Sequence, residues 1–511
     1  MRDLRIIGSL VAALAALAMS APASAQGAGG QPPELLMSVG IGPDNTLDNL
    51  RAFANAMQPG VGGMLSSALL RQQIARMTTA TSLDGLDEKG TIYVLAVDGG
   101  PALKGAAVAG KIADEKRLAQ SVGAAHLVKR NGWAVIGPKL VAEKVAPFAT
   151  GTLAGQAISG PPVATIYAAN LTTRYKTEIA DARQKLVASF ASTGGGQMSA
   201  MGQLYFDGLF SMLGDSERVI VTFDVTKDVG AIDVGLVPKA GTRLAKFIGL
   251  QQPSDYAIAS QLPATQAPVL VAGHFDAGPY RQGLFELTTM LYGTGSSMAS
   301  ALDAVFKVAT GDFVMAMTMG GPNGMEVTQL FGVTDNKAAD KAVGRLLDAF
   351  KKPVTASVMG MTTTNTLNPS TTTHDGVSIR GVDVTYDLSK ATPENRAMME
   401  KMVPKNGSAV RVALFDKLGA VVSSASPTAV TAAIDAARGK GKRYAPTAQV
   451  ADFLAGSRTR KESLAAVMDL GAAVGAGPGR VVMMSMGFAD KRAHFRFALP
   501  AATVRAFAGA P

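Results

Sequence analysis

The chain has no cysteine among its 511 residues. This absence excludes a disulfide framework, a thiolate nucleophile and any metal site that needs a cysteine ligand. It also excludes a lipid-modified cysteine as a membrane tether. Stability must therefore come from buried apolar surface, which a chain of this length can supply because larger chains bury a larger fraction of their surface.

Histidine and charge are also scarce, with four histidines and 17% charged residues. The formal net charge is +10, but 47% of the residues are apolar, which is not the composition of a nucleic-acid-binding tail. A basic and apolar-rich chain can associate with an anionic surface, or it can be basic for solubility alone. Both interpretations stay open at the level of composition.

Long hydrophobic runs are missing beyond the first residues of the chain. Arg2 and Arg5 precede an apolar run at residues 6–19, and the small residues 23–25 follow it. This is the pattern of a secretory signal peptide, and we expect it to comprise residues 1–25. No later stretch has the roughly 18 apolar residues of a transmembrane helix. The sequence therefore predicts an exported periplasmic protein, soluble or peripheral to the membrane, with no transmembrane segment.

Local signatures of catalysis and cofactor binding are absent as well. The sequence contains no Gly-x-Ser-x-Gly elbow, no Ser-x-x-Lys pair, no phosphate-binding Gly-Lys-Ser/Thr loop and no dinucleotide-binding glycine motif. We therefore expect no cofactor and favour a non-enzymatic protein. The alternative is a hydrolase-like periplasmic enzyme whose site lies between the two halves of the chain.

What the sequence does contain is a set of segments that occur twice in the same order. Residues 90–122 align without gaps to residues 311–343, and both place Gly-Gly-Pro at an expected hairpin. Asp114 and Asp335 then lie where a side-chain oxygen can cap the following helix. Residues 218–238 and 480–500 both open with Arg-Val, close on Pro and have a polar middle typical of a hairpin turn. Ordered matches of this kind indicate an internal duplication.

These matches predict an α+β fold made of two diverged tandem repeats. Hairpins predominate, so each repeat should be a mainly antiparallel sheet with amphipathic helices packed on one face. We place repeat 1 at residues 26–252, a proline-marked linker at 253–266 and repeat 2 at 267–511. Apolar residues at helical spacing predict the first helix of each repeat: these are Leu47, Leu50, Ala54 and Met57, and then Leu284, Leu287 and Leu291.

Repeat 2 carries an insertion at about residues 354–388. Its first half is rich in Thr, Ser and Asn and is typical of a loop or linker. Residues 377–388 predict a hairpin with its turn at Gly381.

A cluster of cations is the first candidate for a ligand-binding surface. It could bind an anionic envelope lipid or surface, or a protein partner. A solvated loop is the other interpretation, and the lack of interleaved aromatic residues argues against nucleic acid. The cluster consists of Arg438, Lys440, Lys442, Arg443, Arg458, Arg460 and Lys461.

Metal binding is a minor alternative. His274 and Asp276 lie two apart on an expected strand and so share one face. Met315, Met317 and Met319 share a strand face in the same way, and thioethers can bind Cu(I) in a cysteine-free protein. Ordinary packing is the competing interpretation, because methionine also fills irregular apolar cores.

Acidic residues before the expected strand at residue 91 are the last candidate. Asp84, Asp87 and Glu88 do not match a calcium-binding loop and are typical of a solvated turn. Taken together, the sequence favours an exported, non-enzymatic envelope protein that binds a hydrophobic ligand, a lipid surface or a partner protein.

Overall fold

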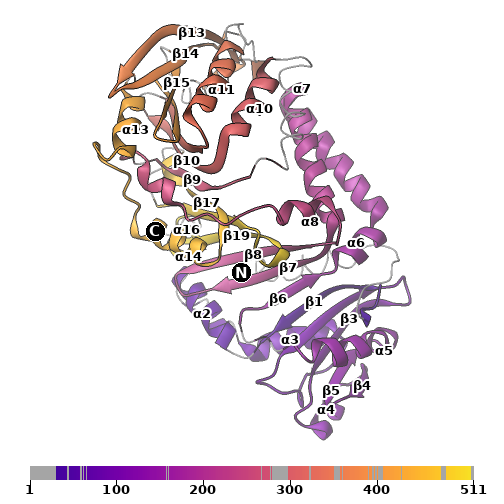
Figure 1. Cartoon of the computed structure of the whole chain (residues 1–511). Helices are drawn as coiled ribbons and strands as arrows, with labels where there is room; N and C mark the ends of the chain where they lie inside the picture. The colour runs from indigo at the N-terminus through magenta and orange to yellow at the C-terminus, as the bar shows by residue number, and fades with distance from the viewer. Residues whose placement is uncertain are drawn as a thin grey trace. The chain divides into compact units, whose positions relative to one another are not determined.

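Antiparallel strand pairing dominates the computed structural model of the chain, which is α+β as expected (Figure 1). The structure describes residues 30–507 except 43–44, 58–59, 61, 65, 157, 159, 266, 277, 279–296, 322–323, 350–356, 359–360, 390, 394–395, 398–399, 401–406, 427 and 474–478. The expected signal peptide and the expected helix at Leu284, Leu287 and Leu291 lie outside these residues.

Contacts divide the chain into two units. Unit 1 comprises Met1–Ser189, Gln203–Ala245 and Arg496–Pro511, and unit 2 comprises Phe190–Gly202 and Lys246–Phe495. The last residues of the chain therefore belong with unit 1, whereas the predicted boundaries place them in repeat 2.

The strands of unit 1 pair in the spatial order β4-β5-β3-β2-β1-β6-β7-β8, and every pair is antiparallel. The expected hairpin at 218–238 is β7–β8. The strands are β1 Leu35–Ile41, β2 Ile92–Asp98, β3 Lys104–Lys111, β4 His126–Arg130, β5 Trp133–Gly137, β6 Val163–Ile166, β7 Ser216–Val225 and β8 Val229–Pro238.

Helices cover both faces of this sheet, so the expectation of helices on one face was wrong for unit 1. Tyr93 and Leu95 of β2 pack in one core with residues of α5 (Lys139–Phe148). Ile92 and Val94, which alternate with them, pack in a second core with α3 (Ser67–Met77) and α4 (Glu115–Ser121). The reason is visible in β2 itself, because a continuous apolar strand needs cover on both sides.

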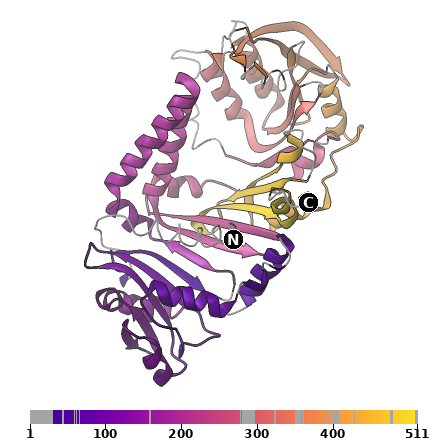
Figure 2. The ribbon, with the colours of Figure 1, turned by 180° about the vertical axis from the view of Figure 1, so that it is seen from behind.

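The other helices of unit 1 are α2 Asn45–Met57, the short η2 Gly62–Met64, the π-helical turn η3 Ala149–Leu153, α6 Ala168–Arg174 and α16 Ala501–Phe507. Helix α7 Lys176–Asp215 begins and ends in unit 1, but its middle residues Phe190–Gly202 belong to unit 2. In both views the C-terminal helix α16 lies next to α2, against which it packs (Figures 1 and 2).

Arg496 fixes this C-terminal segment to the β7–β8 hairpin. Its guanidinium binds Asp224 at 2.7 Å and Asp233 at 2.6 Å, one carboxylate from each strand. The backbone N–H of Ala501 donates to the carbonyl of Asp228 in the turn between them. The Arg496 side chain is 13% exposed, whereas Asp224 is 42% exposed and Asp233 25%, so the pairs are partly shielded from water.

Helix α7 folds back on itself, as Figure 1 shows. Arg183 and Asp207 are 24 residues apart, yet their side chains form an ion pair of 2.6 Å. In a straight helix, which rises 1.5 Å per residue, they would be about 36 Å apart. The glycines at 194–196 lie between the two halves, where the chain must reverse.

The strands of unit 2 pair in the spatial order β12-β13-β14-β15-β16-β11-β10-β9-β17-β18, again all antiparallel. They are β9 Val269–His274, β10 Ala309–Gly321, β11 Gly324–Val333, β12 Ser357–Val358, β13 Met361–His374, β14 Val377–Asp387, β15 Ser408–Phe415, β16 Leu418–Ser424, β17 Glu462–Asp469 and β18 Val481–Gly487. A further strand, β19 Ala493–Pro500, begins in unit 2 and ends in unit 1.

The helices of unit 2 connect these strands. They are η4 Ala257–Gln261, α10 Ser297–Val308, α11 Asn336–Ala349, α13 Ala429–Ala437, α14 Ala448–Thr459, α15 Leu470–Ala473 and η6 Ala489–Lys491. Helix α8 Arg243–Ile248 lies at the boundary of the two units.

The predicted insertion at about residues 354–388 contains a strand where we expected a loop. Its Thr-rich half forms β13, which pairs along its length with β14. The turn is at Asp375 and Gly376 rather than at Gly381, which pairs with Asn368 inside the ladder. Threonine is polar but β-branched, and this favours a strand more than its polarity favours a loop.

The two units share an order of strand pairing. In unit 1, β1 pairs with β2 and β6, and in unit 2, β9 pairs with β10 and β17. The gapless alignment matches Ile92 with Phe313 and Gly110 with Phe331. In the structure Ile92 pairs with Gly110, and Phe313 pairs with Phe331. The aligned hairpins therefore have the same register.

None of the described helices is both long enough and apolar enough to span a bilayer.

A buried ion pair in unit 1 yields a stability prediction. Asp98 at the end of β2 binds Arg174 of α6 at 2.9 Å, and both side chains are under 5% exposed. Asp98→Ala should lower the free energy of unfolding by about 3–5 kcal/mol, because it leaves a buried guanidinium without its counter-charge. Urea denaturation measures this loss. Asp48→Ala, which breaks an exposed pair with Arg51, should cost less than about 1 kcal/mol. Equal losses in the two variants would contradict the buried role.

Candidate functional site

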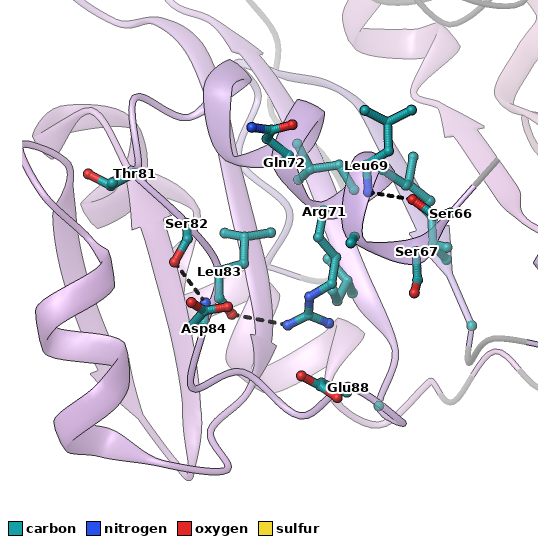
Figure 3. A pocket seen from close by; sticks show the side chains of 17 residues that line it. Ser66, Ser67, Leu69, Arg71, Gln72, Thr81, Ser82, Leu83, Asp84 and Glu88 are labelled. Carbon is teal, nitrogen blue, oxygen red and sulfur yellow. Dashed lines mark hydrogen bonds between the residues drawn. The ribbon is translucent and has the colours of Figure 1, made fainter. Parts of the chain in front are cut away.

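A groove of about 650 Å³ lies in unit 1 beside α3 (Figure 3). It is formed by the end of β1, by α3, by the loop before β2 and by the start of β2. Its apolar lining consists of Ile41, Leu69, Leu70, Ile74, Leu83 and Ile92. Its polar lining consists of Ser66, Ser67, Arg71, Gln72, Thr81, Ser82, Asp84 and Glu88.

Helix α3 forms one wall of the groove, and its position is set by an N-cap and by its buried face. Ser66 caps it, its hydroxyl accepting from the N–H of Leu69 at 3.1 Å. Ile74 and Ala75 face the core, which leaves Leu69 turned outward and 39% exposed. The helix therefore presents an apolar side chain to the groove that no part of the described fold covers fully.

The loop before β2 provides the opposite wall. Gly85 has a φ of +95°, and a Cβ there would collide with the backbone of Leu118 in α4. Its carbonyl accepts from the N–H groups of Ala113 and Asp114 at 2.9 and 3.0 Å. A glycine is thus needed for the loop to lie this close to the start of α4.

Arg71 connects the two walls. Its Nη2 donates to the carbonyl of Leu83 at 3.0 Å and to that of Leu86 at 3.3 Å. Figure 3 shows its guanidinium reaching from α3 toward the loop, with Glu88 below it. Asp84 and Glu88 add two carboxylates to the same groove. The groove thus combines an apolar lining with a cation and two anions, a suitable environment for a molecule that is both apolar and charged.

The predicted cation cluster is divided in the structure and is largely paired. Arg438 binds Asp375 and Asp416, and Lys440 also binds Asp375. Hydrogen bonds from Lys440, which has the larger effect, and from Arg438 hold the pKa of Asp375 below its ordinary value. Arg460 binds Glu462 through two hydrogen bonds of 2.9 and 3.0 Å.

The other four cations are arranged differently. Arg443 donates to the carbonyls of Ala436 and Ala437, and Arg458 donates to the carbonyl of Asp255. Lys442 and Lys461 form no side-chain hydrogen bond or ion pair with the described residues. A role of the cluster in binding a lipid or partner stays a prediction, carried by the four cations that form no ion pair with the described residues.

Two of the residues suggested for a metal, His274 and Asp276, have different hydrogen-bond partners. His274 Nδ1 faces Asp312 Oδ1 at 2.9 Å, whereas Asp276 accepts from the N–H of Gly278. Met315 and Met317 are partly buried in β10, and the side chain of Met319 lies outside the described residues. Among the residues that the structure describes, no group of three or more His, Asp or Glu side chains could hold a metal ion.

A second polar cluster, in unit 2, was not apparent from the sequence. Glu462 is fully buried at the start of β17, where it binds Arg460 and lies 3.7 Å from His494 Nε2. The hydroxyl of Tyr256 donates to the carbonyl of Glu462, and burial raises the pKa of that tyrosine. Arg460 and Glu462 are two residues apart in the sequence, whereas His494 and Tyr256 are brought to them by the fold.

Comparisons with known proteins add little to this geometry. No family model matches the chain, and no curated protein matches it. A solved structure titled "Structure of crystal form III of TP0453" aligns with 50% of this chain and 98% of its own, at 6% identity and a TM-score of 0.25. A likeness at that TM-score does not establish a shared fold.

The cluster around His494 predicts how stability depends on pH. Burial lowers the pKa of His494 below its ordinary value of 6.5, and this effect outweighs the nearby Glu462. The unfolded chain therefore binds a proton at this histidine more readily, and stability should fall as pH drops below about 6.5. Melting temperatures at pH 7.5 and 5.5 measure the loss. The His494→Gln variant should lose less melting temperature between these two pH values. The His126→Gln variant, changed at a histidine whose side chain is 37% exposed, should lose as much as the unmodified chain.

Arg71 should hold the loop wall of the groove in place. Arg71→Met removes hydrogen bonds from a charged donor, each worth about 1.5–3 kcal/mol. Amide hydrogen exchange in residues 83–90 should therefore become at least about tenfold faster. Arg76→Met, at an exposed position of the same helix, is the matched control. Unchanged exchange in the loop of the Arg71 variant would show that other contacts hold it.

Proposed function

We propose that this chain is an exported, non-enzymatic envelope protein that binds a small amphipathic molecule in the groove of unit 1. The observation that supports this most is the groove's lining, in which Leu69 and Leu70 lie beside Arg71, Asp84 and Glu88. Apolar walls with a few polar groups are typical of ligand sites. Export to the periplasm rests on the signal-peptide pattern of residues 1–25.

The charges in the groove favour a particular kind of amphiphile. Arg71 can meet a phosphate or carboxylate, since Nε and Nη1 form no hydrogen bond with the described residues. Asp84 and Glu88 can meet a cation. A single hydrocarbon chain with a zwitterionic headgroup satisfies both, and the chain would lie against the apolar side chains of α3. No histidine lines the groove, which favours binding over acid–base chemistry.

We further infer that the two units descend from a tandem duplication. The shared order of strand pairing and the common register of the aligned hairpins support this. Unit 2 would then have gained the β13–β14 hairpin, which pairs at the outer edge of β15. After a duplication, unit 2 need not retain the residues that line the groove of unit 1. A ligand site in one unit alone is therefore compatible with this origin.

Dodecylphosphocholine below its micelle concentration is a direct probe of the groove. Isothermal titration should show saturable binding to the full chain. Leu69→Asn should weaken binding by about tenfold or more, because burying a leucine side chain is worth about 1.5–3 kcal/mol. Leu140→Asn changes an exposed leucine elsewhere in unit 1 and should leave binding unchanged.

Two outcomes would contradict the proposal. The first is no saturable binding of dodecylphosphocholine to the unmodified chain, and the second is equal weakening by both leucine variants. Release of phosphocholine during the titration would instead support the hydrolase alternative.

A further inference from the structure

A second, smaller pocket of about 290 Å³ lies on the other face of the unit 1 sheet, under α5 and η3. Its floor is made by Ser38 and Gly40, which share one face of β1. Gly40 pairs with Tyr93 of β2 and Val163 of β6, and Ser38 pairs with Thr165. A Cβ at Gly40 would collide with the side chains of Ile158 and Tyr93, so a glycine is needed here for the pocket to stay open above β1.

Aromatic side chains form the walls. Phe148 and Tyr167 meet edge to face with ring centroids 6.2 Å apart, and Tyr93 stands at the opposite side of Gly40. The hydroxyl of Tyr167 lies 3.0 Å from that of Ser38, and the hydroxyl of Tyr93 donates to the carbonyl of Gln156. The pocket therefore combines apolar and polar lining in similar amounts, with hydroxyl groups near its floor.

One cation lines this pocket. A β-bulge between Ser216 and Arg218 interrupts the register of β7, so that both Glu217 and Arg218 line the pocket. Arg218 Nε is buried and donates no hydrogen bond to the described residues. The Arg218 side chain as a whole is 42% exposed, and its Nε lies 3.5 Å from Oε1 of Glu217, which is 45% exposed. A buried donor atom without a hydrogen-bond acceptor is costly, and an anion in the pocket would supply one.

We propose that this pocket binds a small carboxylate with a compact apolar body, independently of the groove beside α3. The carboxylate would accept from Arg218, and the body would lie between Tyr93, Phe148 and Tyr167. The volume equals that of about ten water molecules at roughly 30 Å³ each, which limits the ligand to about ten heavy atoms. A monocyclic aromatic acid meets both conditions.

Trp133 provides the readout, since it is the single tryptophan of the chain and its ring lies 6.3 Å from that of Tyr93. Phenylacetate should change its fluorescence saturably, and calorimetry should give the same affinity. Phenylacetamide has the same shape without the charge and should bind at least tenfold more weakly. This comparison uses the unmodified protein, so it does not depend on how any variant folds.

Variants then locate the site. Arg218→Met should weaken phenylacetate binding by at least tenfold and remove the preference for the acid over the amide. Arg117→Met changes the charge equally at an exposed position and should have no effect. Leu69→Asn should leave phenylacetate binding unchanged, which separates this pocket from the groove.

Three results would overturn the proposal: phenylacetamide binding as well as phenylacetate, no effect of Arg218→Met in a folded variant, or weakening by Leu69→Asn. Failure of the unmodified chain to bind phenylacetate at millimolar concentration would overturn it as well. Neither dodecylphosphocholine binding nor its absence bears on this test.

Discussion

The position of strand β1 between β2 and β6 is the constraint on which the rest of unit 1 depends. One edge of β1 pairs with a strand that follows two helices, and the other pairs with a strand about 125 residues further along the chain. Its two faces serve different cavities, with Ile41 in the groove and Ser38 and Gly40 in the smaller pocket. A register slip of one residue would exchange these faces and remove both cavities.

Much of the fold could be predicted because its signals are local. Gly-Gly-Pro, two apolar runs and an N-capping aspartate mark the β2–β3 hairpin and α4, and Asp114 does accept from the N–H groups of Lys116 and Arg117. The failures have physical causes. The continuous apolar run of β2 already implied cover on both faces, and the threonines of β13 are as suited to a strand as valine is.

The sites were harder to predict because their parts are distant in sequence. Asp84 and Glu88 have the sequence pattern of a solvated turn, because nothing in the sequence indicates that Arg71 reaches that loop. The cation cluster is visible in the sequence, but the carboxylates that bind Arg438 and Lys440 belong to Asp375 and Asp416, 22 to 65 residues away along the chain. Charge in a sequence is easily counted, whereas its neutralisation depends on tertiary contacts.

The ion pairs of Arg496 have a consequence for the order in which the protein is made. Asp224 and Asp233 are synthesised more than 250 residues before the guanidinium that binds them. Until residue 496 has been synthesised, the β7–β8 segment lacks this guanidinium, and α2 lacks its contact to α16. Unit 1 is first in the sequence but cannot be completed first, and a chain that stops short of residue 496 leaves it open at that edge.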